Sequence, residues 1–175
     1  MDRDRLVRLP YLISYGSLTT MSSDSRHGIP YVGAMMRLGW QWVRDEIFSG
    51  VVAAGYDDVT PAHVGLFRYP GLNGQRPSEL ADQMHITKQS VNDLLGHLEQ
   101  QGYLIREADL TDGRARVVHL TPKGRRLEKT VTSQSQAAEV RIAEMLGTRR
   151  FTHLRHALEE LAEAMTQNDL KSPTT

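Results

Sequence analysis

The sequence contains no cysteine. This absence excludes disulfide bonds, zinc sites built on thiolates and a cysteine-based redox sensor. No apolar run reaches the roughly 18 residues that a membrane-spanning helix needs. The apolar stretch 6–13 is interrupted by Arg8 and Pro10, which breaks the core of a secretory signal. We therefore expect a cytoplasmic protein without a membrane partner.

The chain also lacks a net charge, because 21 basic residues balance 21 acidic ones. A neutral protein is at first sight a poor ligand for nucleic acid, but the distribution of charge matters more than its sum. Residues 114–126 hold five cations and no acid, whereas acids gather near the C-terminus. The five cations are Arg114, Arg116, Lys123, Arg125 and Arg126. The segment 114–126 is therefore a candidate surface for an anionic partner.

Motifs of catalysis are missing as well. The sequence holds no phosphate-binding loop, no dinucleotide-binding glycine motif, no H-E-x-x-H and no Ser-His-Asp grouping that spacing supports. His153 and His156 share a helix face but lack the third ligand that a catalytic zinc site requires. We expect neither an enzyme nor a bound metal or cofactor.

The centre of the chain has the pattern of two short helices followed by a hairpin. The spacing predicts a helix over 77–83, a turn at 84–86 and a second helix that is capped by Thr87, runs to Gln100 and has an apolar stripe. The stripe consists of Val91, Leu94, Leu95 and Leu98. Strands are expected at 103–107 and 114–120, joined by a turn that contains Asp112-Gly113. This order is that of a winged helix-turn-helix.

Longer helices are expected on both sides of this centre. The sequence predicts helices over 31–54, 61–69 and 122–146, with Thr60 and Thr121 as N-caps, and a last helix capped by Thr148. The last helix carries apolar residues at steps of 3, 4, 3 and 4. These residues are Phe151, Leu154, Leu158, Leu161 and Met165. The seam packs either within the chain or on a second copy, and the excess apolar surface of the first helix favours a dimer.

The helix after Thr87 has a polar outer face. It displays Gln89, Asn92, Asp93, Gly96 and His97. Gln and Asn can each form two hydrogen bonds with adenine in the major groove. Thr87, Lys88 and Ser90 stand at the helix start, where backbone amides favour phosphate. The alternative is a solvated face of an ordinary helical bundle, but the basic hairpin favours DNA, because Arg114 and Arg116 suit a narrow minor groove.

Two stretches carry a family resemblance. Pro77-Ser78-Glu79-Leu80-Ala81 through Gly102-Tyr103-Leu104, and the run from Asp112-Gly113-Arg114 to Leu120-Thr121-Pro122-Lys123-Gly124, resemble the MarR family of winged helix-turn-helix transcription regulators. The resemblance implies a mainly α fold with a small β wing. It also implies that Arg114 enters the minor groove and that Asp112 braces the wing through an ion pair.

The resemblance further implies the domain organisation and the partners. Residues 57–120 would form the DNA-binding domain, and 29–56 with 121–168 would form dimerisation helices. Residues 1–28 and 169–175 would be flexible tails. The expected function is a homodimeric repressor on a pseudo-palindromic double-stranded DNA operator. The alternative is a winged-helix module that binds another protein.

Many members of the family respond to small aromatic acids. The corresponding region of this chain contains aromatic residues and one cation, which would suit an aromatic carboxylate. The candidate ligand-binding residues are Arg37, Trp40, Trp42, His63 and Phe67. The alternative for these aromatic side chains is an ordinary place in the hydrophobic core.

Overall fold

The computed structural model describes residues 31–67, 71–109 and 115–169. The chain divides into two compact units after Arg37, and the smaller unit is described only by the first turns of helix α1. All packing described below belongs to the larger unit, which begins at Leu38. The expected tail 1–28, residues 170–175, and the wing residues Asp112 and Arg114 lie outside the described residues.

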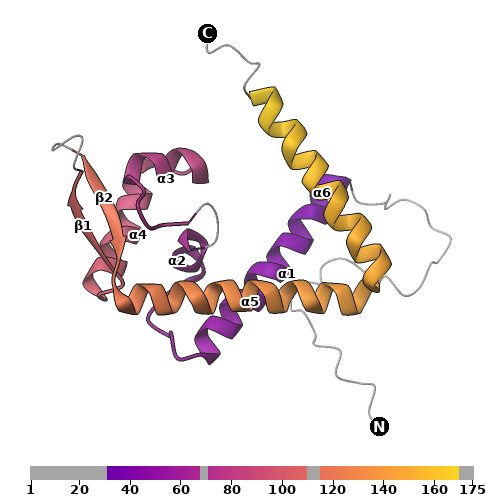
Figure 1. The fold of residues 1–175 in the computed structure, drawn as a ribbon, viewed down its shortest axis with the longest axis horizontal. Coiled ribbons are helices and arrows are strands. Elements are labelled where there is room, and N and C mark those ends of the chain that lie inside the picture. The colour runs from indigo at the N-terminus through magenta and orange to yellow at the C-terminus, as the bar shows by residue number, and fades with distance from the viewer. Residues whose placement is uncertain (1–30, 68–70, 110–114, 170–175) are drawn as a thin grey trace. The chain divides into compact units, whose positions relative to one another are not determined.

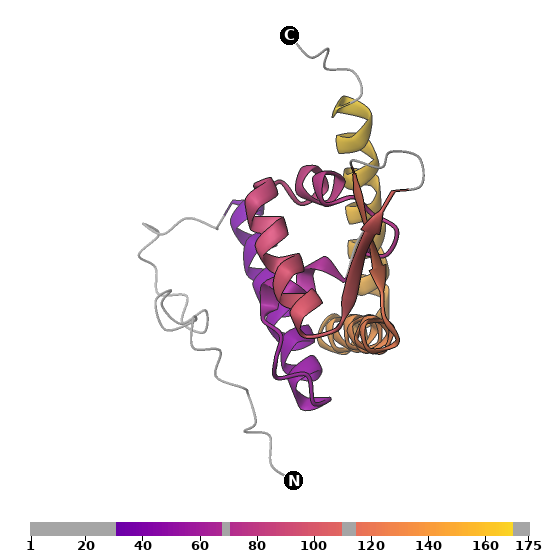
Figure 2. The same ribbon diagram turned by 90° about the vertical axis from the view of Figure 1, so that its left-hand side faces the viewer.

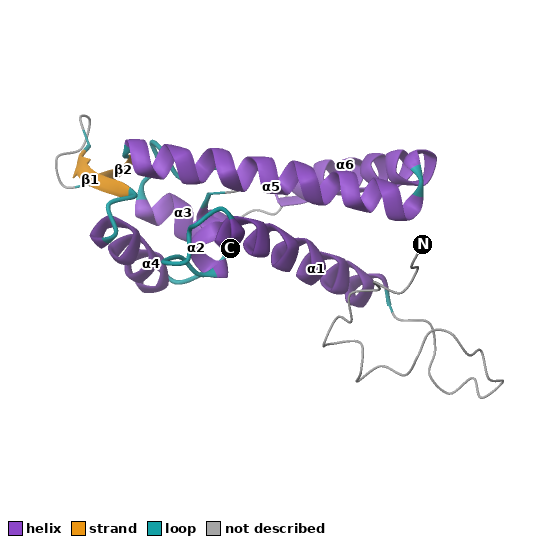
Figure 3. Cartoon of the chain, turned by 90° about the horizontal axis from the view of Figure 1, so that it is seen from below, coloured by secondary structure: helices purple, strands orange, loops and turns teal. Residues whose placement is uncertain are grey.

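The described residues form helices and one hairpin in the predicted order. The elements are α1 (Val32–Ala53), α2 (Pro61–Leu66), α3 (Pro77–Met84), α4 (Lys88–Gln100), β1 (Leu104–Ala108), β2 (Arg116–Leu120), α5 (Pro122–Leu146) and α6 (Thr148–Asp169). In the larger unit, α3, α4 and the hairpin lie at the beginning of α5, and α6 starts at its other end (Figure 1). Figure 3 shows that the strands occur only at that first end. The prediction of a mainly α fold with a small β wing is confirmed.

Three helices begin at the predicted threonine caps. The side-chain oxygens of Thr60, Thr87 and Thr121 each accept a hydrogen bond from the amide three residues later. Each such cap contributes on the order of 1 kcal/mol, because it satisfies an amide that has no partner within the helix. Thr148 was expected to be a fourth cap, but it is the first residue of α6 itself.

The hydrophobic core is centred on the winged lobe, by which we mean the described residues between 57 and 120, and α1 and α5 add further residues to it. Val91, Leu95 and Leu98 of α4 are fully buried, as their spacing predicted, and Leu94 packs against them. The first half of α5 closes the core with Leu127 and other apolar residues. The complete set is Ile47, Val51, Val59, Val64, Leu66, Phe67, Leu72, Leu80, Ala81, Val91, Leu95, Leu98, Tyr103, Leu104, Val118, Leu120, Leu127, Val131 and Ala138.

The wing is a two-stranded antiparallel sheet in which Leu104 pairs with Leu120 and Ala108 with Arg116. The segment 73–75 lies along the free edge of β2. The amide of Gly74 donates to the Val118 carbonyl (2.8 Å), and the Val118 amide donates to the Gln75 carbonyl (3.0 Å). The sequence carries no signal for this contact, because a segment of this length is too short to show strand periodicity. Figure 2, which looks along α5, shows the hairpin standing above this helix.

Helix α6 has a different environment. None of its described side chains is buried, and Phe151 alone is half-buried. The remaining residues of the predicted seam, Leu154, Leu158, Leu161 and Met165, are 41–59% exposed. On α1, Leu38 and Trp40 are also about half exposed, at 44% and 51%. The larger unit therefore leaves a continuous stripe of α6 without an apolar cover.

Candidate functional site

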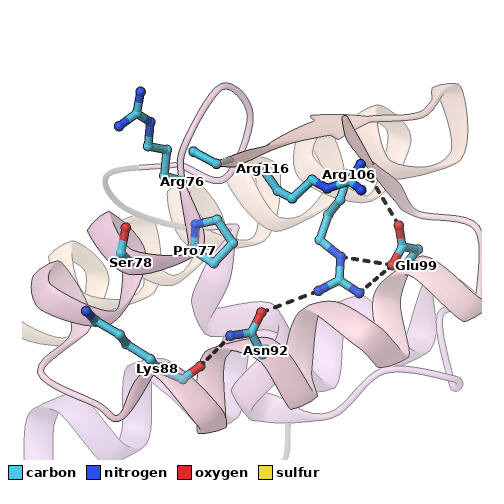
Figure 4. Close-up of a pocket in the computed structure, with 9 residues that line it drawn as sticks. Arg76, Pro77, Ser78, Lys88, Asn92, Glu99, Arg106 and Arg116 are labelled. Atoms are coloured by element: carbon cyan, nitrogen blue, oxygen red, sulfur yellow. Dashed lines mark hydrogen bonds and ion pairs between the residues drawn. The ribbon is translucent and has the colours of Figure 1, made fainter. Parts of the chain in front are cut away.

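A groove of about 750 Å³ lies where α3, α4 and the wing strands meet. We call it the basic groove, because four of its side chains are cationic and one is anionic. It is lined by Arg76, Pro77, Ser78, Lys88, Asn92, Glu99, Arg106, Ala115 and Arg116 (Figure 4). The groove joins the start of α4 to β2, so the helix and the hairpin present their cations to one space.

Two ion pairs hold the walls of the basic groove. The Arg106 guanidinium of β1 bonds the Glu99 carboxylate of α4 through Nη2 (2.5 Å) and Nε (2.9 Å). Arg76, which precedes α3, bonds Asp109 at the end of β1 at 2.5 and 2.7 Å. In each pair two guanidinium nitrogens donate to one carboxylate oxygen, Oε2 of Glu99 or Oδ2 of Asp109, and such charge-assisted bonds are stronger than neutral ones. They attach the wing to both helices of the helix-turn-helix.

The other two cations of the groove have no such partner. Among the described residues, neither Lys88 nor Arg116 forms an ion pair, and both are exposed. Lys88 is the first residue of α4, where the unpaired amides and the helix dipole favour an anion. The electrostatics of the groove therefore combine fixed walls with two cations that remain available to a ligand.

The outer face of α4 carries most of the residues predicted to touch DNA. Thr87, Lys88, Gln89, Ser90, Asn92 and Asp93 are all exposed. The Thr87 hydroxyl lies 2.8 Å from that of Ser90, so these two form one unit at the helix start. The Asn92 amide donates to the Lys88 carbonyl (2.9 Å) and accepts from Arg106 (3.4 Å) (Figure 4). Among the described residues, in contrast, the side chains of Gln89 and Asp93 have no hydrogen-bond or ion-pair partner.

His97, predicted for the same face, does not lie there. Its Nε2 is 2.8 Å from the Asp58 carbonyl oxygen, and its ring stacks on His63 at a centroid distance of 4.5 Å. A step of four residues keeps His97 near the face of Asp93 but turns it by about 40° towards Leu94, and α2 contacts α4 on that flank through His63. We therefore remove His97 from the residues that we expect at a DNA contact.

Lys123 is also turned inward. Its ammonium lies 3.0 Å from the Asp58 carboxylate and 4.0 Å above the ring of Tyr103. Tyr103 donates a hydrogen bond to the same carboxylate (2.5 Å). Burial raises the pKa of Asp58, but the bonds from Tyr103 and Lys123 outweigh it and hold this pKa below its usual value. Burial, with the bond to Asp58, raises the pKa of Tyr103. Only Arg125 and Arg126 of the predicted basic helix start remain exposed.

The four candidate ligand-binding residues of the larger unit do not meet in one site. His63 and Phe67 are buried in the core, as the alternative interpretation had it, and Arg37 belongs to the smaller unit. Trp40 lines an apolar groove of about 590 Å³ between α1, α5 and α6, whereas Trp42 is half-buried outside its lining. We call it the Trp40 groove. Its other lining residues are Val43, Ile47, Gly65, Ser135, Ala138, Glu139, Ile142, Phe151, Leu154, Arg155, Leu158, Glu159 and Ala162.

Within the part of the chain that the structure describes, no three His, Asp or Glu side chains gather as metal ligands would. The same residues include no helix that is long and apolar enough to span a bilayer.

Comparisons with known proteins agree with this geometry. Residues 57–115 match the sequence model of the MarR family. The HTH-type transcriptional repressor Rv2887 of Mycobacterium tuberculosis is 32% identical over 96 residues, which are 55% of this chain and 67% of that protein. A putative transcriptional regulatory protein for the hcr operon of Thauera aromatica is 30% identical over 50% of this chain and 56% of its own length.

Solved structures are similar over a longer stretch. Rv2887 in complex with salicylic acid gives a TM-score of 0.59 at 26% identity, covering 77% of this chain and 98% of that one. The repressor CouR bound to a 23-mer DNA duplex gives a TM-score of 0.64 at 21% identity, covering 82% and 99%. MarR itself gives 0.70 at 21% identity, covering 88% and 100%. At 21% identity, the similarities to CouR and MarR concern the fold.

Proposed function

Because this chain belongs to the MarR family of transcription regulators, we propose that it is a cytoplasmic, homodimeric repressor that reads a pseudo-palindromic DNA operator with α4 and the wing. The basic groove carries the proposal. The groove brings together the start of α4, its polar face and the hairpin. Two of its cations, Lys88 and Arg116, form no ion pair with any described residue. Members of this family regulate transcription and are not enzymes.

Helix α4 would lie in the major groove of the duplex. Gln89 and Asp93 would contact base edges, because their side chains are exposed and have no hydrogen-bond or ion-pair partner among the described residues. Asn92 is already oriented by its bonds to Lys88 and Arg106, which leave one N–H and one lone pair for a base, so we assign it a smaller role than Gln89. Lys88, Thr87 and Ser90 would hold phosphates at the positive end of the helix.

The wing would follow the backbone into the neighbouring minor groove. Arg116 borders the basic groove from β2 and supplies one cation for this contact. Arg114, with Asp112 as its brace, remains our proposal for the tip of the wing, although both lie outside the described residues. Long cations inserted beside a turn suit a narrow, electronegative minor groove.

The exposed stripe of α6 supports the dimer. Two copies packed through Leu154, Leu158 and Leu161 would cover each other's apolar residues, as the 3, 4 spacing of a helical seam requires. Such a dimer would set two α4 helices about 34 Å apart along one face of the DNA. Repression would follow from occupation of the promoter.

A small aromatic effector remains part of the proposal, in view of the relative that binds salicylic acid. The Trp40 groove supports it better than the five residues suggested by sequence, because Trp40 and Phe151 supply aromatic walls beside Arg155. A bound effector would release DNA only if it preferred a spacing of the two lobes that does not fit the operator.

The test is equilibrium binding to the DNA upstream of the protein's own gene, beside a scrambled duplex, at increasing salt. Binding through several phosphates should weaken by orders of magnitude between about 50 and 200 mM salt. Gln89→Ala should relax preference at one base pair by about 1–3 kcal/mol, whereas Lys88→Ala should weaken both duplexes and reduce the salt slope by about 1.

Arg150→Ala is the matched control, since it removes an exposed cation from α6 rather than from the basic groove. Weak, equal and salt-insensitive binding to both duplexes would contradict the proposal. It would favour the alternative function of a winged-helix module that binds another protein.

A further inference from the structure

Two residues assigned from sequence to different sites, His63 and His97, lie against each other inside the winged lobe. Their rings are stacked, with a centroid distance of 4.5 Å and an interplanar angle of 11°. His63 comes from α2 and is 5% exposed, and His97 comes from the flank of α4. No other side-chain hydrogen bond or ring contact in the described residues joins α2 to α4.

Hydrogen bonds determine the protonation of both rings. The Nδ1 of His63 lies 3.0 Å from the backbone amide of Thr60, which can only donate. This nitrogen therefore accepts, and the His63 ring is neutral with its proton on Nε2. The Nε2 of His97 lies 2.8 Å from the Asp58 carbonyl oxygen, which can only accept, so this nitrogen carries a proton.

We propose that the His63–His97 stack is a positioning element, which fixes α4 on α2 only while His63 is neutral. A proton on Nδ1 of His63 would remove the acceptor for the Thr60 amide and thus break the capping box at the start of α2. It would also place a positive charge against the second ring. The contacts that hold the segment 58–60, α2 and α4 together would then be lost.

The surroundings of the stack disfavour the protonation of His63. Burial is the main cause that lowers the pKa of His63. The nearby His97 lowers this pKa further, whereas Asp58 raises it. Asp58 is the charged group that faces the stack from the α1–α2 connection, and its carboxylate is already held by Tyr103 and Lys123. His97 is the titratable group that faces His63 from α4.

The sign of the pH dependence follows from these directions. A histidine whose pKa is lower in the folded state stabilises the fold fully above its unfolded pKa, about 6.5, and progressively less as the pH falls below it. Acid should therefore loosen α4 before it affects α6. The consequence for DNA selectivity rests on the proposed function, since it requires α4 to be the helix that reads bases.

Hydrogen exchange of the full-length protein between pH 7.5 and 5.5, corrected for the intrinsic rate, tests the proposal. Protection of α4 should fall roughly tenfold in the natural protein, and the protection of α6 should not follow it. His63→Gln should abolish most of this fall, because Gln at the third helical position keeps the capping box but does not titrate. His153→Gln removes an exposed histidine from α6 and should leave the profile unchanged.

Equal pH dependence in His63→Gln and the natural protein would overturn the proposal, as would protection of α4 that does not change with pH. Should His63→Gln fail to fold, ¹⁵N shifts of the imidazoles in the natural protein give the answer. A proton on Nε2 of His63 that moves to both nitrogens as α4 loosens supports the proposal, and a doubly protonated ring at pH 7.5 refutes it. A result with intact pH-dependent protection but no selective DNA binding would refute only the proposed function.

Discussion

Helix α4 of the winged lobe and helix α6 both carry an apolar stripe, but the stripe of α4 is buried and that of α6 is exposed. The stripe of α4 is fully buried at Val91, Leu95 and Leu98, whereas that of α6 is more than 40% exposed at Leu154, Leu158 and Leu161. Both stripes have the same 3, 4 periodicity. The difference lies in what surrounds them, because α2, α3 and β1 all contact α4, whereas the main contact of α6 is with α5.

The ion pairs of the two regions differ in exposure in the same way. In the lobe, Arg106 and Glu99 are 27% and 36% exposed, while Arg155 and Glu139 between α6 and α5 are 58% and 55% exposed. The lobe, closed by residues of α1 and α5, thus has an enclosed core and fixed polar contacts. The exposed apolar residues of α6 are those that the proposed dimer would cover.

The largest expected effect is on assembly. Leu158→Glu places a carboxylate in the middle of the α6 stripe and should convert the proposed dimer into a monomer of 19.7 kDa. The cost of desolvating a charge at an apolar interface is the reason. Light scattering after gel filtration measures the mass, and circular dichroism should show that the helices remain.

Thr152→Glu is the matched control, since it adds the same charge to the opposite face of α6 and should leave the mass of the dimer unchanged. A monomeric natural protein would contradict the proposed dimer, and so would a dimer that survives Leu158→Glu.

The next largest expected effect is on the stability of the winged lobe. A methyl group on Gly124 of α5 would lie 1.9 Å from the carbonyl oxygen of Tyr103, which is far inside van der Waals contact. Gly124→Ala should therefore lower the free energy of unfolding by about 2–3 kcal/mol, as overpacking does. Urea denaturation measures it. Gly96→Ala in α4 meets no atom within 4 Å and should be neutral or stabilising by up to about 1 kcal/mol.

The sequence predicted the elements of the lobe because their signals are local. Thr60, Thr87 and Thr121 are followed by the residues that their caps require, and the stripe of α4 needs only its own spacing. The MarR resemblance depended on the same local segments. These signals are independent of the neighbouring elements, so they were sufficient to define the lobe.

The contents of the sites were harder to predict, because they depend on contacts between distant residues. His97 bonds to Asp58, 39 residues away, and Arg76 pairs with Asp109 across 33 residues. The sequence contained no signal for either pair. The ligand-binding residues are hard to predict for the same reason, because helical spacing does not tell whether an aromatic residue such as Phe67 faces a groove or the core.

The smallest expected effect compares the ion pairs of the two regions. Glu99→Gln removes the charge that holds Arg106 through two bonds, one of 2.5 Å and one of 2.9 Å, and should lower the free energy of unfolding by about 1 kcal/mol. Glu139→Gln should change it by less than about 0.5 kcal/mol, because its partner is exposed and Arg155 keeps its bond to Glu159.

Urea denaturation in low and high salt measures both variants. The difference between Glu99→Gln and the natural protein should persist in 0.5 M salt, since a partly buried pair is screened less than an exposed one. Equal losses in the two variants would mean that the wing is not held more firmly than α6. In that case Arg106 would have no special part in attaching the wing to α4, and the fixed wall of the basic groove would depend on Arg76 and Asp109 alone.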